Sequence, residues 1–181
     1  MDNKDRLLAR FNSLERDRRM LLDQLDRHDA GSLARIPRPD AWSVAQVIMH
    51  FVLVERGSLA YLMRKLEMGN SGQAGTFSGV RSGLLNLTVG LPLRFKAPPM
   101  VAVVPVCSYG DAFEAWAAVR TDLEHSLAAL PPALLDHGLF KHPVAGRLTP
   151  EQGLRFMAAH HRRHRGQIQR TLASIGRMPP D

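Results

Sequence analysis

The chain has 181 residues, a length that favours one domain, and 45% of them are hydrophobic, which is enough for a core. Only 6% are aromatic, so leucine, alanine, valine and methionine must fill most of that core. The formal net charge of +7 raises the question of nucleic-acid binding. However, the basic residues near the N-terminus alternate with acidic ones, and no aromatic residues interleave with the basic C-terminal cluster. We therefore expect no nucleic-acid partner.

Three features of the sequence bear on the cellular location of the protein. No run approaches the ~20 apolar residues of a membrane span, and the first ten residues, MDNKDRLLAR, lack the apolar centre of a signal peptide. The single cysteine, Cys107, cannot form a disulfide within the chain. We expect a soluble, cytoplasmic protein with no membrane association, forming a single domain over residues 1–181.

The first predicted element is an amphipathic helix from about Asp2 to Asp29, followed by a loop. Its apolar stripe has steps of three, four or seven and comprises Leu7, Phe11, Leu14, Leu21, Leu25 and His28. The charged residues between them, among them Glu15, are typical of a solvated face.

A second helix is predicted to start after Ser43, because Ser43 and Gln46 form the pattern of a capping box, and to run to about Leu66. Residues 72–107 are rich in glycine and proline and are harder to interpret. We expect a short helix over about Val80 to Val89 and an extended, buried apolar connector over about Leu91 to Val106.

A third helix is predicted from about Ser108 or Asp111 to Pro131, with an apolar stripe that includes Phe113 and Trp116. The fourth is predicted from Thr149, again with a capping-box pattern, to about Ile175. Four long helices without convincing strands predict an all-α fold. We interpret it as a four-helix bundle with a long crossover between helices two and three.

Two histidines of the fourth helix, His160 and His164, are four residues apart, so their imidazoles project from one face. This spacing allows two nitrogens to bind one metal ion from a helix. Both lie in phase with Phe156 and Ile168, so they point inward, where an imidazole needs a polar partner. His161 is rotated about 100° and cannot share that face. A core pair hydrogen-bonded to carboxylates is the alternative interpretation.

A third ligand is available in the second helix, where His50 interrupts the otherwise apolar run VIMHFVLV. A lone histidine there is usually a core residue with a satisfied hydrogen bond, but bundle cores also build metal sites from histidines on facing helices. Three imidazoles would leave positions open for water or substrate, as in catalytic sites. The sequence thus predicts a divalent metal site on His50, His160 and His164.

Two stretches carry a resemblance to a known family. WSVAQVIMHFVLVERG and HPVAGRLTPEQGLRFMAAHHRRHRGQI are similar to motifs of the DinB/YfiT-like superfamily of metalloenzymes. The resemblance implies a four-helix bundle of unusual connectivity and a divalent ion, zinc or nickel, on His50, His160 and His164. It further implies that some relatives are thiol-dependent transferases or isomerases and that a homodimer is an option. The family name derives from DNA-damage induction and implies no DNA binding.

Further side chains are weaker candidates. Glu55, five residues after His50, is a candidate general base, and Arg163 a candidate for binding an anionic substrate. Gln167, three after His164, is a candidate for orienting that ligand. Each of these three residues also has a structural interpretation. For Gln46, we favour a role in capping the helix over one in lining a pocket.

The leading functional hypothesis is a metal-dependent enzyme that acts on a small molecule, either a hydrolase or a thiol-dependent transferase. The alternative is a non-catalytic bundle that binds a ligand or a metal. The sequence does not select the substrate, the metal or the reaction.

Overall fold

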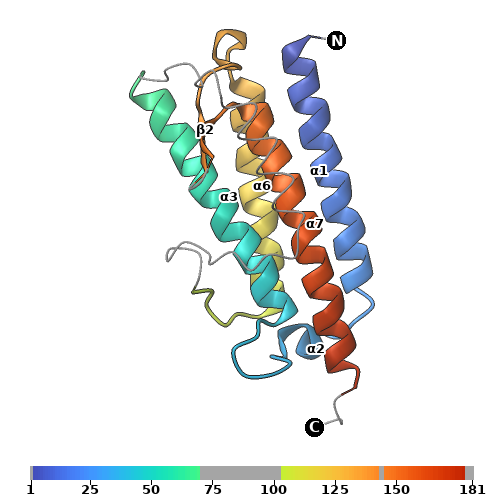
Figure 1. Cartoon of the computed structure of the whole chain (residues 1–181). Coiled ribbons are helices and arrows are strands. Elements are labelled where there is room, and N and C mark those ends of the chain that lie inside the picture. Colours follow the sequence, from blue (N-terminus) through green and yellow to red (C-terminus); the bar gives the residue numbers. More distant parts are fainter. Residues whose placement is uncertain (1, 70–102, 143–144, 178–181) are drawn as a thin grey trace.

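The structure is a computed structural model that describes residues 2–69, 103–142 and 145–177. Within these ranges the protein is mostly helical, and four helices have more than 20 residues. They run side by side along one direction in Figure 1. They are α1 (Asn3–Leu25, 23 residues), α3 (Val44–Glu67, 24 residues), α6 (Tyr109–Ala129, 21 residues) and α7 (Pro150–Ile175, 26 residues). The prediction of a predominantly helical protein agrees with this structure.

Side-chain caps set where the long helices begin. Ser43 accepts a hydrogen bond from the Gln46 amide, while the Gln46 side chain accepts one from the Ser43 amide, so the predicted capping box is confirmed. Thr149 and Gln152 make the same reciprocal pair, with Pro150 in the first helical position. These two helices are the ones that carry the predicted metal ligands, and both start where the sequence places them.

The first helix is shorter than predicted. It ends at Leu25, and a separate short helix, α2 (Ala30–Ala34), follows. Asp29 starts this helix, since its carboxylate accepts hydrogen bonds from both the amide and the hydroxyl of Ser32. His28, which the periodicity placed on the apolar stripe, is exposed as a result.

The expectation that the chain contains no strands was wrong. Strands β1 (Phe140–His142) and β2 (Gly146–Leu148) pair antiparallel, with Phe140 opposite Leu148. Gly146 has a positive φ of 77°, a conformation that glycine adopts without strain. A short 3₁₀ helix, η1 (Pro132–Leu134), precedes the hairpin in the chain. The buried Phe140 and Leu148 anchor the hairpin to the core.

Two clusters of buried apolar side chains form the core. One joins α1, α6, the hairpin and the start of α7. The other includes Val47 and Phe51 of α3, Trp116 of α6 and Ile168 of α7. This second cluster surrounds the level at which the histidines lie. Phe113, expected on the apolar stripe of α6, is 38% exposed.

The predicted helix over Val80 to Val89 lies outside the described residues, as does most of the predicted connector. Of the connector's last residues, Val104 is buried, whereas Val103 and Val106 are 80% and 74% exposed, so the expectation of a buried segment holds only at Val104. The side-chain Nε2 of Gln46 donates to the Val104 carbonyl at 3.2 Å, which holds this segment against the start of α3.

In the described part of the chain, no helix combines the length and the apolar character needed to cross a membrane.

Candidate metal centre

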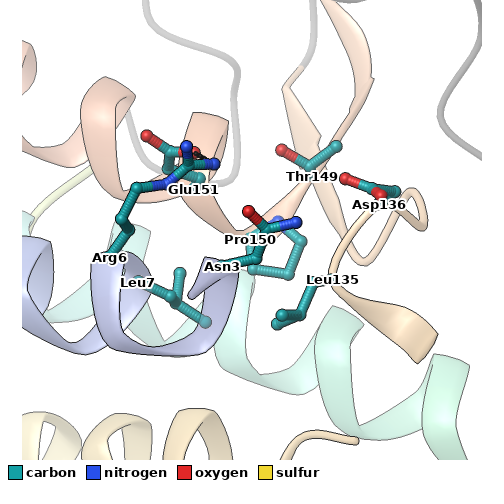
Figure 2. Close-up of a pocket in the computed structure, with 8 residues that line it drawn as sticks. All are labelled: Asn3, Arg6, Leu7, Leu135, Asp136, Thr149, Pro150 and Glu151. Atoms are coloured by element: carbon teal, nitrogen blue, oxygen red, sulfur yellow. Dashed lines mark ion pairs between the residues drawn. The ribbon is translucent and has the colours of Figure 1, made fainter. Parts of the chain in front are cut away.

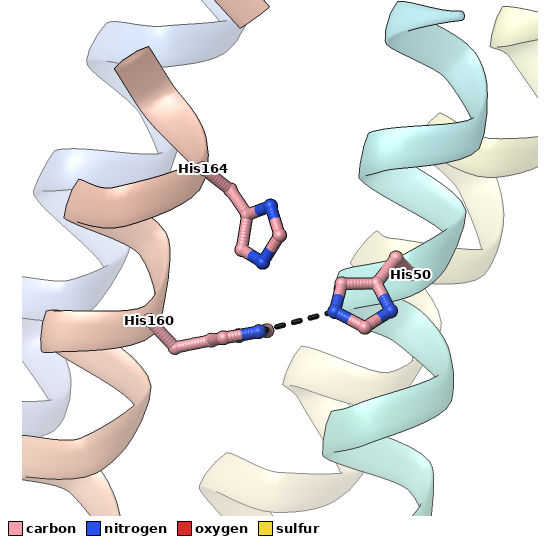
Figure 3. Close-up of side chains that lie close together, drawn as sticks. All are labelled: His50, His160 and His164. Atoms are coloured by element: carbon pink, nitrogen blue, oxygen red, sulfur yellow. Dashed lines mark hydrogen bonds between the residues drawn. The ribbon is translucent and has the colours of Figure 1, made fainter. Parts of the chain in front are cut away.

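The three histidines predicted as ligands come together between α3 and α7. Figure 3 shows the rings of His160 and His164 projecting from α7 toward His50 on α3. One ring nitrogen from each of the three lies within 4.8 Å of the others. The Nε2 atoms of His50 and His160 are 3.1 Å apart. The convergence depends on the one-turn spacing within α7 and on the close packing of α7 against α3.

Burial lowers the pKa of the His160 and His164 imidazoles. His50 is 3% exposed, and His160 and His164 are partly buried. Desolvation holds the pKa of His160 well below its ordinary value of 6.5, and the neighbouring His164 and His50 act in the same direction. Desolvation also lowers the pKa of His164, although the hydrogen bond to Gln167 opposes it. The imidazoles of His160 and His164 are therefore neutral near pH 7, the form that binds a metal ion.

Gln167 orients one of the candidate ligands. Its Oε1 lies 2.8 Å from Nδ1 of His164, so Nδ1 must carry the proton and donate it to this bond. The lone pair of His164 is then on Nε2. A ligating histidine commonly donates its other ring N–H to an oxygen acceptor, which fixes both tautomer and ring orientation. This contact corresponds to the role that the sequence suggested for Gln167.

Aromatic side chains enclose the cluster. The Trp42 ring lies 5.0 Å from that of His50, and Phe156 stacks on His160 at 5.7 Å, with the two ring planes 20° apart. Phe51 contacts the rings of His160 and His164 at 5.7 Å each. These apolar walls explain the desolvation that keeps the imidazoles neutral.

Glu55, the candidate general base, is 1% exposed and has several partners. Its Oε2 accepts from Trp116 Nε1 at 3.1 Å and from Arg120 Nε at 2.7 Å. Its Oε1 lies 2.8 Å from His161 Nε2 and 2.8 Å from Arg120 Nη2. The histidine that Glu55 meets is thus His161, outside the three-histidine cluster. The role of Glu55 as a general base stays a prediction.

His161 and its partners form a polar cluster that the sequence interpretation missed. His161 is 9% exposed, and its bond to Glu55 satisfies an imidazole that the helix turns away from His160 and His164. Glu15, which the charge pattern assigned to a solvated face, is also 9% exposed and pairs with Arg120 at 2.9 Å. Charged residues on α1, α3 and α6 were the available signal, but their pairing depends on the packing of the helices.

Arg163, the candidate for substrate binding, is partly buried on α7. Its positive charge contributes to the lowered pKa values of both His160 and His164, so the guanidinium lies near the cluster. Nδ1 of His142 accepts a hydrogen bond from the Ala145 backbone amide at 3.1 Å, and its ring packs on Phe156. Cys107 is partly buried, and burial followed by the charge of Asp111 raises the pKa of its thiol.

A small surface pocket lies elsewhere, where α1 and α7 begin. Figure 2 shows its lining, which includes Asn3, Arg6, Pro150 and Glu151. The Arg6 guanidinium and the Glu151 carboxylate approach to 3.8 Å across it. Because His160 follows Pro150 by ten residues, the pocket is about 15 Å along α7 from the histidines. It is therefore distinct from the candidate metal centre.

The donor set fits a divalent ion. A tetrahedral zinc site with bonds of about 2.0 Å requires neighbouring nitrogens about 3.3 Å apart. The 3.1 Å between the Nε2 atoms of His50 and His160 is close to that separation. One ring nitrogen from each of the three histidines lies within 4.8 Å of the other two. The neutral rings of His160 and His164 and the tautomer of His164 fixed by Gln167 also suit metal ligands.

The long helices bring three imidazoles to one point, an arrangement compatible with metal binding in a mostly helical protein. The chain belongs to the DinB superfamily, whose family model matches residues 13–168. This match confirms the resemblance found in the sequence. No curated protein and no solved structure matches the chain significantly.

Proposed function

We propose that this chain is a metal-dependent enzyme that holds one divalent ion on His50, His160 and His164. The proposal includes a single domain with the architecture of a four-helix bundle, in which a long crossover connects α3 to α6. The observation that carries it is the convergence of three ring nitrogens within 4.8 Å of one another. Membership of the DinB superfamily supports the same conclusion.

Three protein ligands leave coordination positions for an exogenous molecule, which is the composition of catalytic zinc sites. Imidazole ligands suit zinc and nickel, and we propose one of these two. The bound ion would supply a Lewis acid that lowers the pKa of a coordinated water or thiol. The chain itself contributes the aromatic rings beside the site, Gln167 that orients His164, and the positive charge of Arg163.

Two reaction classes are compatible with this chemistry, hydrolysis by an activated water and transfer to or from an activated thiol. Both require a small-molecule substrate that reaches the open positions of the site. The proximity of Arg163 favours a substrate with an anionic group, because a guanidinium binds carboxylates and phosphates in a bidentate manner.

Metal analysis of the purified protein tests the site. We expect about one equivalent of zinc or nickel in the wild type, and a loss of most of it in His50→Ala and His164→Ala. The exposed His125 offers the matched control, because it lies on α6 away from the cluster. His125→Ala should retain the metal. Equal metal content in all four proteins would refute the assignment of the ligands.

The open coordination positions are tested with the cobalt-substituted protein. Addition of a small thiol should produce a sulfur-to-cobalt charge-transfer band if the thiol enters the coordination sphere. Addition of azide should alter the visible spectrum if a small anion can displace water. A spectrum that responds to neither would identify a closed site, and the non-catalytic interpretation would then replace the enzymatic one.

A further inference from the structure

A single buried side chain, Arg120 of α6, connects all four long helices. Its Nη1 donates to Glu15 of α1 at 2.9 Å. Its Nε and Nη2 donate to the two oxygens of Glu55 of α3, at 2.7 and 2.8 Å. Its Nη2 also lies 3.3 Å from Nε2 of His161 of α7. We call Arg120, Glu15, Glu55 and His161 the Arg120 cluster.

The protonation of His161 follows from its neighbours. Nε2 lies 2.8 Å from a carboxylate oxygen of Glu55, which can only accept, so Nε2 must carry a proton and donate it. The 3.3 Å approach of Arg120 Nη2 to the same nitrogen is then a packing contact rather than a hydrogen bond. The bond from His161 to Glu55 therefore links α7 directly to α3.

This link joins the same two helices that carry the candidate metal ligands. His161 is the residue after His160 on α7, and Glu55 lies five residues after His50 on α3, about 7.5 Å along the helix axis. Phe51 contacts both sites, since its ring is 4.5 Å from that of His161 and 5.7 Å from that of His160. A shift of α7 that broke the His161 bond would also separate His160 from His50.

Stability alone is a weak reason for such a cluster. Buried ion pairs lose much of their Coulomb energy to desolvation, and apolar residues of similar volume often stabilise a fold equally well. What buried, directional bonds do provide is a fixed geometry. A metal site needs that, because its ligands must be held within about 0.5 Å of the productive arrangement.

We propose that the Arg120 cluster is a positioning device for the metal centre, which fixes α7 against α3 so that the three ligand nitrogens are preorganised. His161, Glu55 and Arg120 are positioning residues in this proposal and do not touch the ion. The inference rests on the proposed function, since it assigns the cluster a role at the same site. It also gives Glu55 a role other than that of a general base.

The test uses a pair of substitutions at His161. His161→Gln keeps an N–H donor that can reach Glu55. His161→Leu removes the donor and puts an apolar side chain of similar size in its place. We expect zinc affinity, measured by competition with a chromogenic chelator, to fall about 10- to 100-fold in His161→Leu. His161→Gln should recover most of that affinity. The ion pair between Glu55 and Arg120 remains in both variants, so both should fold.

A control separates positioning from general destabilisation. Leu127 lies on α6 in the other core cluster and is fully buried, so Leu127→Ala destabilises the fold without touching the Arg120 cluster. We expect Leu127→Ala to retain wild-type zinc affinity at room temperature although its unfolding midpoint falls. If His161→Leu and His161→Gln both bind zinc as the wild type does, the cluster is purely structural and the proposal is wrong.

A second readout does not require metal. In the metal-free wild type, nuclear Overhauser effects between the ring protons of His50 and those of His160 and His164 should be observable, because the ring centroids are 5.0 and 4.9 Å apart. They should weaken in His161→Leu and persist in Leu127→Ala. Unchanged contacts in His161→Leu would overturn the positioning role. A wild type that shows these contacts and binds no metal would instead refute the proposed function.

Discussion

His160 and His161 are consecutive in the chain, yet their imidazoles belong to two different polar sites, with ring centroids 6.5 Å apart. The rotation of about 100° per residue in an α-helix directs His160 toward His50 and His161 toward Glu55. Separate substitutions of these adjacent histidines would therefore distinguish the proposed metal binding from structural support.

The first prediction concerns His160 and metal-dependent stability. A ligand that binds only the folded state stabilises it by about 2.7 kcal/mol at about 100 times its dissociation constant. We expect zinc to raise the unfolding midpoint of the wild type and to leave that of His160→Leu unchanged, as measured by differential scanning calorimetry. Without metal, His160→Leu should be at least as stable as the wild type, because it removes a desolvated polar ring.

The control for this prediction is again His125→Ala, in which the response to zinc should equal that of the wild type. A zinc-induced rise in the midpoint of His160→Leu would show that the ion binds elsewhere, and the ligand assignment would be wrong.

The second prediction concerns Glu55 and pH. Burial acts most strongly on its pKa and raises it, but Arg120 and His161 together outweigh burial and lower the pKa from 4.5 to about 2. Because the folded pKa is depressed, the stabilisation is complete above the unfolded pKa of 4.5 and is lost as the pH falls toward 2. This contribution of Glu55 to the free energy of unfolding is on the order of 3 kcal/mol.

Urea unfolding of the wild type and Glu55→Gln between about pH 7 and pH 3 measures this effect. At neutral pH the variant should be less stable, because Arg120 loses a charged partner in the interior. The difference should shrink below pH 4.5, where proton uptake by the unfolded wild type begins to favour unfolding. A difference that stays constant over this range would contradict the assigned pKa.

The helix starts were predictable because their signals are local. Ser43 with Gln46 and Thr149 with Gln152 are patterns within four residues, and both caps form as the sequence indicated. The approach of His160 to His164 was predictable for the same reason. By contrast, the end of the first helix was misplaced, because the periodic stripe continued to His28 while the cap at Asp29 started a new helix.

The Arg120 cluster could not be predicted from local patterns. Arg120 bonds to residues 105 and 65 positions away, and these pairs exist only once four helices adopt a particular axial register. The strands Phe140–His142 and Gly146–Leu148 were missed for another reason: each has three residues, too few for a period-two pattern to stand out. Convergence of His50 with the α7 histidines was inferred from composition and family resemblance rather than from spacing.

The third prediction concerns Lys4, which links α1 to the end of α6. Its ammonium group donates to the carbonyls of Leu127 and Leu130 at 2.6 and 2.5 Å. These carbonyls lie at the C-terminus of a helix, where a cation is favourable. We expect Lys4→Met to lower the free energy of unfolding by about 1 kcal/mol, measured by urea titration. Lys141→Met, at an exposed lysine, should be neutral, and an equal loss in both would exclude the capping role.

The last prediction concerns Gly153, in the first turn of α7, where the hairpin packs on the helix. A Cβ atom at this position would lie 2.6 Å from two ring carbons of Phe140 and 3.1 Å from its Cβ. Neither partner can yield easily, since Phe140 is 2% exposed and fixed in β1. Gly153→Ala should therefore destabilise the protein by about 1 to 3 kcal/mol through overpacking, despite the higher helix propensity of alanine.

Gly57 supplies the matched comparison, because it lies within α3, is exposed, and has no atom within 4 Å of the place that an alanine Cβ would occupy, apart from its chain neighbours and the local helix backbone. Gly57→Ala should stabilise the protein by about 0.5 to 1 kcal/mol, the ordinary gain of removing a glycine from a helix. Changes of opposite sign in the free energy of unfolding, measured by urea unfolding of the two variants, would confirm that the hairpin packs on α7. If Gly153→Ala stabilises as Gly57→Ala does, the hairpin does not pack against the helix start, and the orientation of β1 must differ.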